Sequence, residues 1–231
     1  KRIYPMIFKR IDIDTENNVY LNCYLHEKEP KWDYGFDRPA VVVCPGGGYG
    51  MVSQREAEVI ALHFLPEGFN VFVLTYTVKP HRFPTQLREV AAAMETIYEN
   101  ADAWNTDVER IAIMGFSAGG HLALSSGLLA DNKPNAMILG YPATACPNMP
   151  GMNYMLKLLC GKEEVTDADA VAFELVHQIN KDTPPAFLAA TAEDMLTGFG
   201  ALPVANAYSR LQKGYELHVF QYGPHGYALA N

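Results

Sequence analysis

The sequence predicts an α/β fold with a mostly parallel central sheet, an antiparallel N-terminal edge and helices on both faces. From residue 39 onward, short apolar segments alternate with segments whose apolar residues recur at helical spacing. Such alternation favours parallel strands joined by right-handed crossover helices. Before residue 39, two segments alternate apolar with polar side chains, as expected of antiparallel strands with one solvated face. A single domain is the expected organisation for a chain of 231 residues.

The first two segments, residues 3–14 and 19–26, are predicted to pair as antiparallel strands. Glu16-Asn17-Asn18 between them is typical of a turn. Residues 39–44 are apolar throughout, which indicates a strand covered on both faces. Later strands are expected at residues 69–76, 111–114, 136–141, 186–191 and 215–220. Helices are expected at residues 53–65, 84–100, 121–129 and 203–212.

One serine stands between the strand at 111–114 and the helical pattern that follows it, in Gly115-Phe116-Ser117-Ala118-Gly119. A serine at such a turn is held in a strained backbone conformation. Gly115 and Gly119 are therefore expected where a Cβ would collide with a neighbouring strand or helix. The start of the helix also places free N–H groups beside Ser117, where negative charge develops during acyl transfer. This pattern predicts a nucleophile elbow.

A glycine-rich loop, Pro45-Gly46-Gly47-Gly48-Tyr49-Gly50, follows the strand at 39–44. It fits neither of two common phosphate-binding patterns, G-x-G-x-x-G and G-x-x-x-x-G-K-[ST]. A glycine loop after such a strand can instead aim backbone N–H groups at an oxyanion. We therefore interpret the loop as part of an oxyanion hole.

A serine nucleophile needs a histidine base, and the base needs a carboxylate that fixes its tautomer. The expected order is serine, acid, histidine, and reacting groups lie beyond the carboxyl ends of strands. His225 directly follows the end of the last strand, so we predict that it is the base. Asp194 is the predicted acid, with Glu193 as an open alternative, because both follow the strand at 186–191. His121, one turn into the elbow helix, is expected to pack rather than react.

The composition excludes several classes of partner. A formal net charge of −8 argues against binding to nucleic acid or to an anionic membrane surface. No apolar run reaches the length of a membrane span, so we expect a soluble protein, with the cytoplasm as the default compartment. The sequence begins with Lys1 rather than Met, which leaves open whether a leader was removed.

The cysteines form no C-x-x-C pair and predict no zinc site, and Cys44 is expected to be a small core residue. They are Cys23, Cys44, Cys146 and Cys160.

The alternation of strands and helices lapses over residues 142–185. Three methionines, Met149, Met152 and Met155, precede a helix-like stretch at 168–176. We expect a small lid or pocket wall here rather than a second domain. The methionines fit either an adaptable apolar acyl pocket or ordinary core contacts.

Four blocks of the sequence form one recognisable set: PGGGY (45–49), GFSAGGHLA (115–123), DTPPAFLAATAED (182–194) and ELHVFQYGPHGYAL (216–229). Together they resemble the α/β-hydrolase esterases. They are similar above all to the lipase/esterase group that includes xylan-side-chain esterases, which act on acetylated or feruloylated carbohydrates. The resemblance extends over residues 39–229 and implies an α/β-hydrolase fold and a serine esterase that needs no cofactor.

The resemblance also implies roles for individual residues. Ser117 corresponds to the nucleophile, Asp194 to the acid and His225 to the base. The oxyanion hole would be formed by the N–H groups of Gly47, Gly48 and Ala118.

The chain departs from the family pattern at two places. Pro45 stands where the family usually has a histidine, and an apparent insertion at 197–202 follows the predicted acid. The first departure removes one hydrogen bond that orients the pocket, and the second places a flexible loop with a phenylalanine near the acid.

These residues predict a serine hydrolase that cleaves small ester substrates, including acylated sugars, through an acyl-enzyme. A peptidase of the same fold is one alternative, because it uses the same three side chains. A non-catalytic binding protein on a hydrolase scaffold is the alternative outside the enzymes. The oligomeric state stays open.

Overall fold

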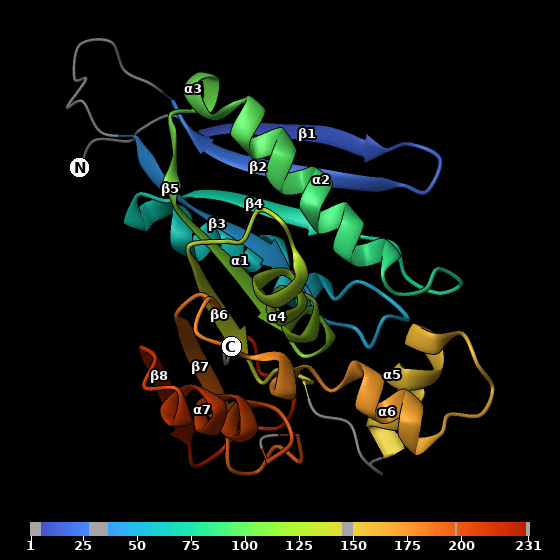
Figure 1. Ribbon diagram of the computed structural model, residues 1–231. Coiled ribbons are helices and arrows are strands. Elements are labelled where there is room, and N and C mark those ends of the chain that lie inside the picture. The colour runs from blue at the N-terminus through green and yellow to red at the C-terminus, as the bar shows by residue number, and fades with distance from the viewer. Residues whose placement is uncertain (1–5, 28–36, 145–149, 197, 230–231) are drawn as a thin grey trace.

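The computed structural model describes residues 6–27, 37–144, 150–196 and 198–229 (Figure 1). Its strands are β1 (Met6–Asp14), β2 (Val19–His26), β3 (Arg38–Cys44), β4 (Asn70–Thr75), β5 (Thr106–Phe116), β6 (Ala136–Gly140), β7 (Ala186–Thr191) and β8 (Tyr215–Phe220). They form one 8-stranded sheet in the order β1-β2-β4-β3-β5-β6-β7-β8. β1 pairs with β2, and β2 with β4, in antiparallel register, whereas every pair from β4 to β8 is parallel. The predicted parallel sheet with an antiparallel N-terminal edge is confirmed.

Helices cover both faces of this sheet. They are α1 (Glu58–Phe64), α2 (Thr85–Glu99), α3 (Ala101–Trp104), α4 (Ala118–Leu129), α5 (Pro150–Cys160), α6 (Asp167–Phe173) and α7 (Ala201–Arg210). On one face, Ile60 of α1 shares an apolar cluster with Val41 and Val43 of β3. On the other face, Val42 of β3 shares a cluster with Val90 of α2, and Figure 1 shows α2 and α4 in front of the sheet. Successive side chains of β3 therefore enter two separate layers of the core, as strand geometry requires.

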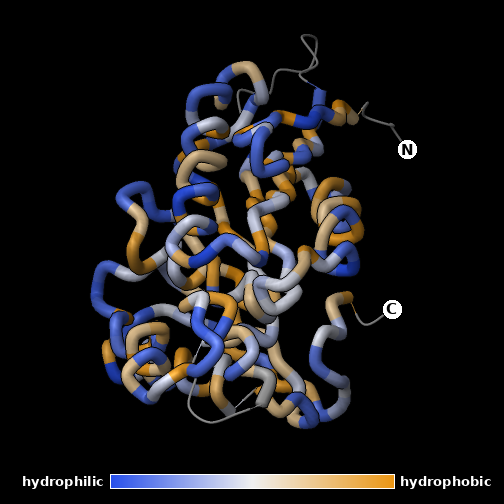
Figure 2. The backbone as a smooth tube through the Cα atoms, turned by 90° about the vertical axis from the view of Figure 1, so that its right-hand side faces the viewer, coloured by the Kyte–Doolittle hydropathy of each residue, from blue (hydrophilic) through white to orange (hydrophobic). Residues whose placement is uncertain are grey.

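The core follows the central strands, and hydrophilic residues occupy most of the outer loops (Figure 2). Val42 and Val43 are both fully buried. The apolar run at 39–44 is thus a strand covered on both faces, as predicted, and Cys44 is a buried core residue with a free thiol.

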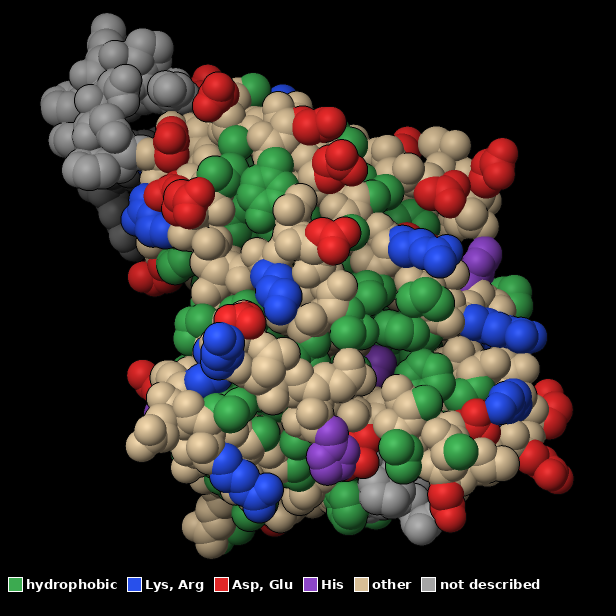
Figure 3. All heavy atoms as spheres, viewed as in Figure 1, with side chains coloured by type: hydrophobic (Ala, Val, Ile, Leu, Met, Phe, Trp, Pro, Cys, Tyr) green, Lys and Arg blue, Asp and Glu red, His purple; other side chains and the backbone are tan. Residues whose placement is uncertain are grey.

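The surface carries charges of both signs. On the face shown in Figure 3, Lys and Arg side chains are interspersed with Asp and Glu. Within the part of the chain that the structure describes, no helix is long and apolar enough to cross a membrane.

The structure differs from the predicted helix at 53–65. The chain instead forms a 3-10 turn at Gln54–Glu56, and α1 begins only after Ala57, whose φ is −108° and ψ is −110°. The break turns the Glu56 side chain inward, where it is buried and accepts hydrogen bonds from two other segments of the chain. Gly68, with φ of 97°, ends this helical region as predicted.

The structure also differs within residues 142–185, because α5 was not predicted. Pro150 is the first residue of α5, where the missing N–H of a proline costs no helical hydrogen bond. Met152 and Met155 on α5 are buried in the main core, whereas Met149 lies outside the described residues. α6 corresponds to the helix-like stretch at 168–176, and α5 and α6 lie beside each other at one end of the sheet (Figure 1).

Candidate active site

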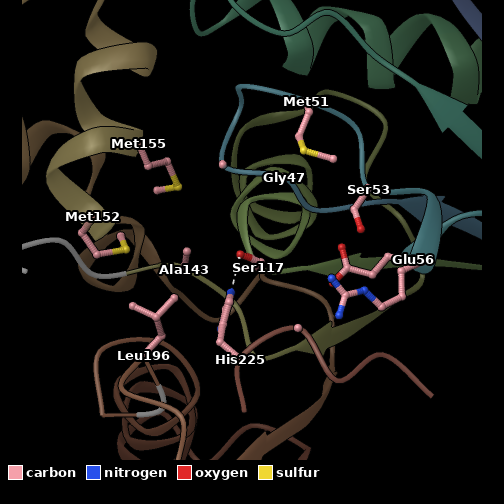
Figure 4. Close-up of a pocket in the computed structure, with 13 residues that line it drawn as sticks. Gly47, Met51, Ser53, Glu56, Ser117, Ala143, Met152, Met155, Leu196 and His225 are labelled. Atoms are coloured by element: carbon pink, nitrogen blue, oxygen red, sulfur yellow. Dashed lines mark hydrogen bonds between the residues drawn. The ribbon is translucent and has the colours of Figure 1, made fainter. Parts of the chain in front are cut away.

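Ser117 occupies the sharp turn between β5 and α4. Its backbone has φ of 52° and ψ of −119°, a conformation that a residue with a side chain rarely adopts. Hydrogen bonds on both sides hold it: the Ser117 N–H donates to the Gly140 carbonyl at 3.1 Å, and the Ser117 carbonyl accepts from the Ala143 N–H at 3.0 Å. The surrounding backbone thus holds a strained residue with its hydroxyl directed into a pocket (Figure 4).

Two glycines permit this turn. A Cβ on Gly115 would lie 2.0 Å from the Gly119 carbonyl oxygen, and a Cβ on Gly119 would lie 2.0 Å from the Cys44 carbonyl oxygen. Both collisions are with backbone atoms, which cannot rotate away. The steric reason that the sequence predicted for these glycines is therefore present, and it allows α4 to pass directly against β5 and β3.

The structure brings the three predicted catalytic side chains together. His225 Nε2 lies 2.8 Å from Ser117 Oγ, and His225 Nδ1 lies 2.9 Å from Asp194 Oδ2. Asp194 is only 4% exposed, and its Oδ1 accepts a hydrogen bond from the Leu196 N–H at 2.9 Å. The imidazole is more open, with 36% of its side chain exposed. A buried carboxylate, a ring at the pocket surface and a hydroxyl thus form one hydrogen-bonded series.

The two carboxylates that the sequence left open have different partners. Asp194 faces His225, whereas Glu193 is exposed and accepts a hydrogen bond from the Gly223 N–H at 3.0 Å. Glu193 therefore contacts the turn before His225 rather than the imidazole ring.

His121 and His218 lie elsewhere. His121 is fully buried, its Nδ1 lies 2.9 Å from the Tyr49 hydroxyl, and burial lowers its pKa to about 4. His218 is exposed on β8, where its ring stacks on Phe187. The packing interpretation of His121 agrees with this placement.

The glycine loop lies beside Ser117. Gly47 and Gly48 both line the pocket that contains Ser117 and His225. The Gly47 carbonyl accepts hydrogen bonds from the N–H groups of Gly50 and Met51, at 3.1 and 3.2 Å, which closes the loop into a turn. Ala118 opens α4, so its N–H has no acceptor within the helix. Gly47 and Gly48 thus line the same pocket as Ser117, and Ala118 directly follows Ser117 in the chain.

The pocket has a volume of about 370 Å³ and two chemically different sides. Figure 4 shows Ser53 and Glu56 on one side of the Ser117–His225 pair, and Met152 and Met155 with Leu196 and Ala143 on the other. In the described part of the chain, no group of three or more His, Cys, Asp and Glu side chains is arranged to hold a metal ion.

Sequence reasoning missed Glu56 and Tyr141. The Glu56 carboxylate accepts hydrogen bonds from the Gly46 N–H and from the Tyr141 hydroxyl, both at 2.7 Å. One signal was available: Glu56 stands four residues before Ile60, on the apolar face of the predicted helix, where an acidic residue is unexpected.

Comparisons with known proteins identify relatives of this chain. Residues 30–140 match the family model described as BD-FAE. An endo-1,4-β-xylanase B of Butyrivibrio fibrisolvens is 32% identical over 231 residues, which cover 91% of this chain and 35% of that protein. An acetylxylan esterase of Xylanibacter ruminicola is 29% identical over 227 residues, which cover 95% of this chain and 46% of that protein. The chain thus spans about a third to a half of the length of these curated relatives.

Solved structures show the same similarity at the level of the fold. MGS-M1, an α/β hydrolase enzyme from a Medee basin deep-sea metagenome library, superposes with a TM-score of 0.80 at 33% sequence identity. The match covers 99% of this chain and 87% of that one.

Proposed function

This chain belongs to the α/β-hydrolase family, and from that premise we propose that it is a serine carboxylesterase. One observation carries the proposal, namely the continuous series of hydrogen bonds from Ser117 through His225 to Asp194, at 2.8 and 2.9 Å. A hydroxyl in this position can transfer its proton to the imidazole while it attacks a carbonyl carbon.

The proposed reaction has two halves. In the first, Ser117 Oγ attacks the ester carbonyl, His225 Nε2 takes the hydroxyl proton, and the same imidazole then protonates the departing alcohol. In the second, His225 removes a proton from water as that water attacks the acyl-enzyme, and it then gives the proton to Ser117 Oγ as the bond to the acyl group breaks and the acid leaves. Asp194 accepts a hydrogen bond from the Nδ1–H throughout and stabilises the imidazolium that forms.

The developing oxyanion is stabilised by the N–H groups of Gly47, Gly48 and Ala118 in this proposal. Gly47 and Gly48 line the pocket that contains Ser117, and Ala118 follows Ser117 at the N-terminal end of α4, where the helix dipole adds positive potential. Each well-placed donor lowers the barrier by about 3 kcal/mol.

We further propose short-acyl esters as substrates, with acetyl or feruloyl groups on carbohydrates as the natural class. The volume of about 370 Å³ suits a small ligand. Met152, Met155 and Leu196 offer an apolar wall to an acyl group, whereas Ser53 and Arg55 offer polar groups to sugar hydroxyls. The similarity to an acetylxylan esterase supports this class.

Ser117→Ala tests the reaction. We expect the variant to lose turnover of a short-chain nitrophenyl ester and labelling by a fluorophosphonate probe, while its unfolding midpoint stays near that of the wild type. Unchanged turnover would refute the assignment of the nucleophile. Cleavage of peptides but not esters by the wild type would identify a peptidase, and binding of acylated sugars without turnover would identify a binding protein.

The substrate class needs a separate measurement. We expect kcat/KM to fall from acetyl to octanoyl nitrophenyl esters, and acetylated xylan oligosaccharides to release acetate. A preference for the octanoyl ester would contradict the proposed short-acyl specificity.

A further inference from the structure

We infer that Glu56 is a positioning residue that couples the glycine loop to the segment carrying His225, an inference that rests on the proposed esterase function. Glu56 is not a member of the Ser117–His225–Asp194 series, yet each of its two carboxylate oxygens is bound to a segment that builds the site. One oxygen holds the glycine loop, and the other holds Tyr141, which in turn contacts the chain after His225.

The first connection runs from Glu56 to the glycine loop. Glu56 Oε2 accepts a hydrogen bond from the Gly46 N–H at 2.7 Å. Gly46 is packed tightly here, since a Cβ on it would lie 2.6 Å from Glu56 Oε2 and 2.7 Å from the Phe116 carbonyl oxygen. Gly46 directly precedes Gly47, so the orientation of the first proposed oxyanion donor depends on this anchored peptide unit.

The second connection runs from Glu56 through Tyr141 to the segment of His225. Glu56 Oε1 accepts a hydrogen bond from the Tyr141 hydroxyl at 2.7 Å, and the same hydroxyl accepts one from the Ala228 N–H at 3.0 Å. The Tyr141 ring meets the His225 ring edge-to-face, with ring centres 5.1 Å apart. Burial and the nearby Glu56 carboxylate both raise the pKa of Tyr141, so its hydroxyl remains a donor at neutral pH.

The position of Glu56 allows one side chain to serve both connections. The 3-10 turn at Gln54–Glu56 ends at Ala57, and the break before α1 directs the Glu56 carboxylate inward, where it is 3% exposed. Figure 4 shows it at the edge of the pocket, on the polar side of Ser117. A buried carboxylate is expensive unless its oxygens are hydrogen-bonded, and both oxygens of Glu56 have such partners.

Glu89 provides a matched control. It is also buried, at 7% exposure, and it also accepts one backbone and one hydroxyl hydrogen bond, from the Thr77 N–H at 2.8 Å and the Thr77 hydroxyl at 2.7 Å. Both of its partners belong to one residue outside the glycine loop and the segment of His225. Glu89→Gln therefore measures the general effect of neutralising a buried carboxylate.

The decisive experiment compares Glu56→Gln with Glu89→Gln in amide hydrogen exchange and in ester turnover. Glutamine has one accepting oxygen, so at position 56 it can satisfy only one of the two donors. We expect faster exchange at the amide of Gly46 or of Ala228, on whichever side loses its acceptor, in Glu56→Gln and at neither amide in Glu89→Gln. We also expect kcat to fall by at least tenfold with KM changed less than about threefold. A misplaced oxyanion donor or base weakens stabilisation of the transition state more than it weakens substrate binding.

Tyr141→Phe tests the same path from its other end. It keeps the ring against His225 but removes the hydroxyl, so we expect faster exchange at Ala228 and a lower kcat. If Glu56 and Tyr141 act as one unit, removing the second adds no further loss. The kcat of the double variant Glu56→Gln/Tyr141→Phe should then equal, within about twofold, that of the less active single variant.

Each outcome decides the inference. Unchanged exchange at Gly46 and Ala228 in Glu56→Gln overturns the coupling, and equal losses of kcat in Glu56→Gln and Glu89→Gln reduce Glu56 to a structural residue. Failure of the esterase proposal looks different: Ser117→Ala would then match the wild type, while the exchange data would still decide the coupling.

Discussion

Asp194→Asn tests the candidate site most directly, because it removes a charge with almost no change of size. Asp194 uses both of its oxygens: Oδ1 accepts from the Leu196 N–H at 2.9 Å, and Oδ2 lies 2.9 Å from His225 Nδ1. Asparagine has only one accepting oxygen, so it can satisfy only one of these two partners.

The two orientations of the amide bracket the expected effect. If the oxygen stays with Leu196, the NH₂ group faces Nδ1 and the imidazole carries its proton on Nε2, toward Ser117. That tautomer cannot accept the hydroxyl proton and lowers kcat on the order of 10⁴-fold, which is about 5 kcal/mol. If the amide flips, its oxygen faces Nδ1 and the active tautomer is kept, but the Leu196 N–H is left unpaired. That costs about 2 kcal/mol, so this orientation is populated less and kcat falls roughly thirtyfold.

The assay is kcat for a short-chain nitrophenyl ester, measured for Asp194→Asn and Glu193→Gln together. We expect a loss of between roughly 30-fold and 10⁴-fold in Asp194→Asn. Glu193→Gln should stay within about threefold of the wild type, because its carboxylate is exposed and contacts the Gly223 N–H instead of the imidazole. A loss under tenfold in Asp194→Asn, or a larger loss in Glu193→Gln, would refute this reasoning.

Two further predictions concern stability. Gly119→Ala should lower the free energy of unfolding by at least about 3 kcal/mol in urea, because its Cβ would lie 2.0 Å from the Cys44 carbonyl oxygen. Gly198→Ala, with no atom within 4 Å of the added Cβ, should change it by less than about 1 kcal/mol, and equal effects would contradict the steric argument. Burial lowers the pKa of His121 from 6.5 to about 4. As the pH drops from 6.5 toward 4, the imidazole is protonated in the unfolded chain but not in the folded one, so the free energy of unfolding falls. Between pH 7 and pH 5, His121→Gln should therefore lose about 2 kcal/mol less stability than the wild type, and equal losses would argue against a neutral buried imidazole.

Much of the fold was predictable from local patterns. The apolar run at 39–44 predicted a strand covered on both faces, because a strand exposes its two faces alternately and both faces here carry only apolar side chains. The elbow was predictable in part: a contact with Gly119 inside the same turn requires Gly115, whereas a contact with Cys44 of β3 requires Gly119. The catalytic roles assigned to Ser117, Asp194 and His225 stay predictions.

Other features depend on contacts between distant residues. The sequence pattern did not distinguish Glu193 from Asp194, because the two residues are adjacent. Which carboxylate is buried against His225 and which is exposed depends on the path of the chain after β7. α5 was hidden because Pro150 suggests a break when it is read without the helix that it begins.

Local sequence thus specified the elements and the order of the reactive residues along the chain, because spacing along a strand, a helix or a turn is a short-range property. Folding specified which groups meet: Ser117 and His225 are 108 residues apart, and Glu56 and Tyr141 are 85 residues apart. These long-range contacts depend on how the whole sheet packs with its helices, and no pattern within a single segment encodes them.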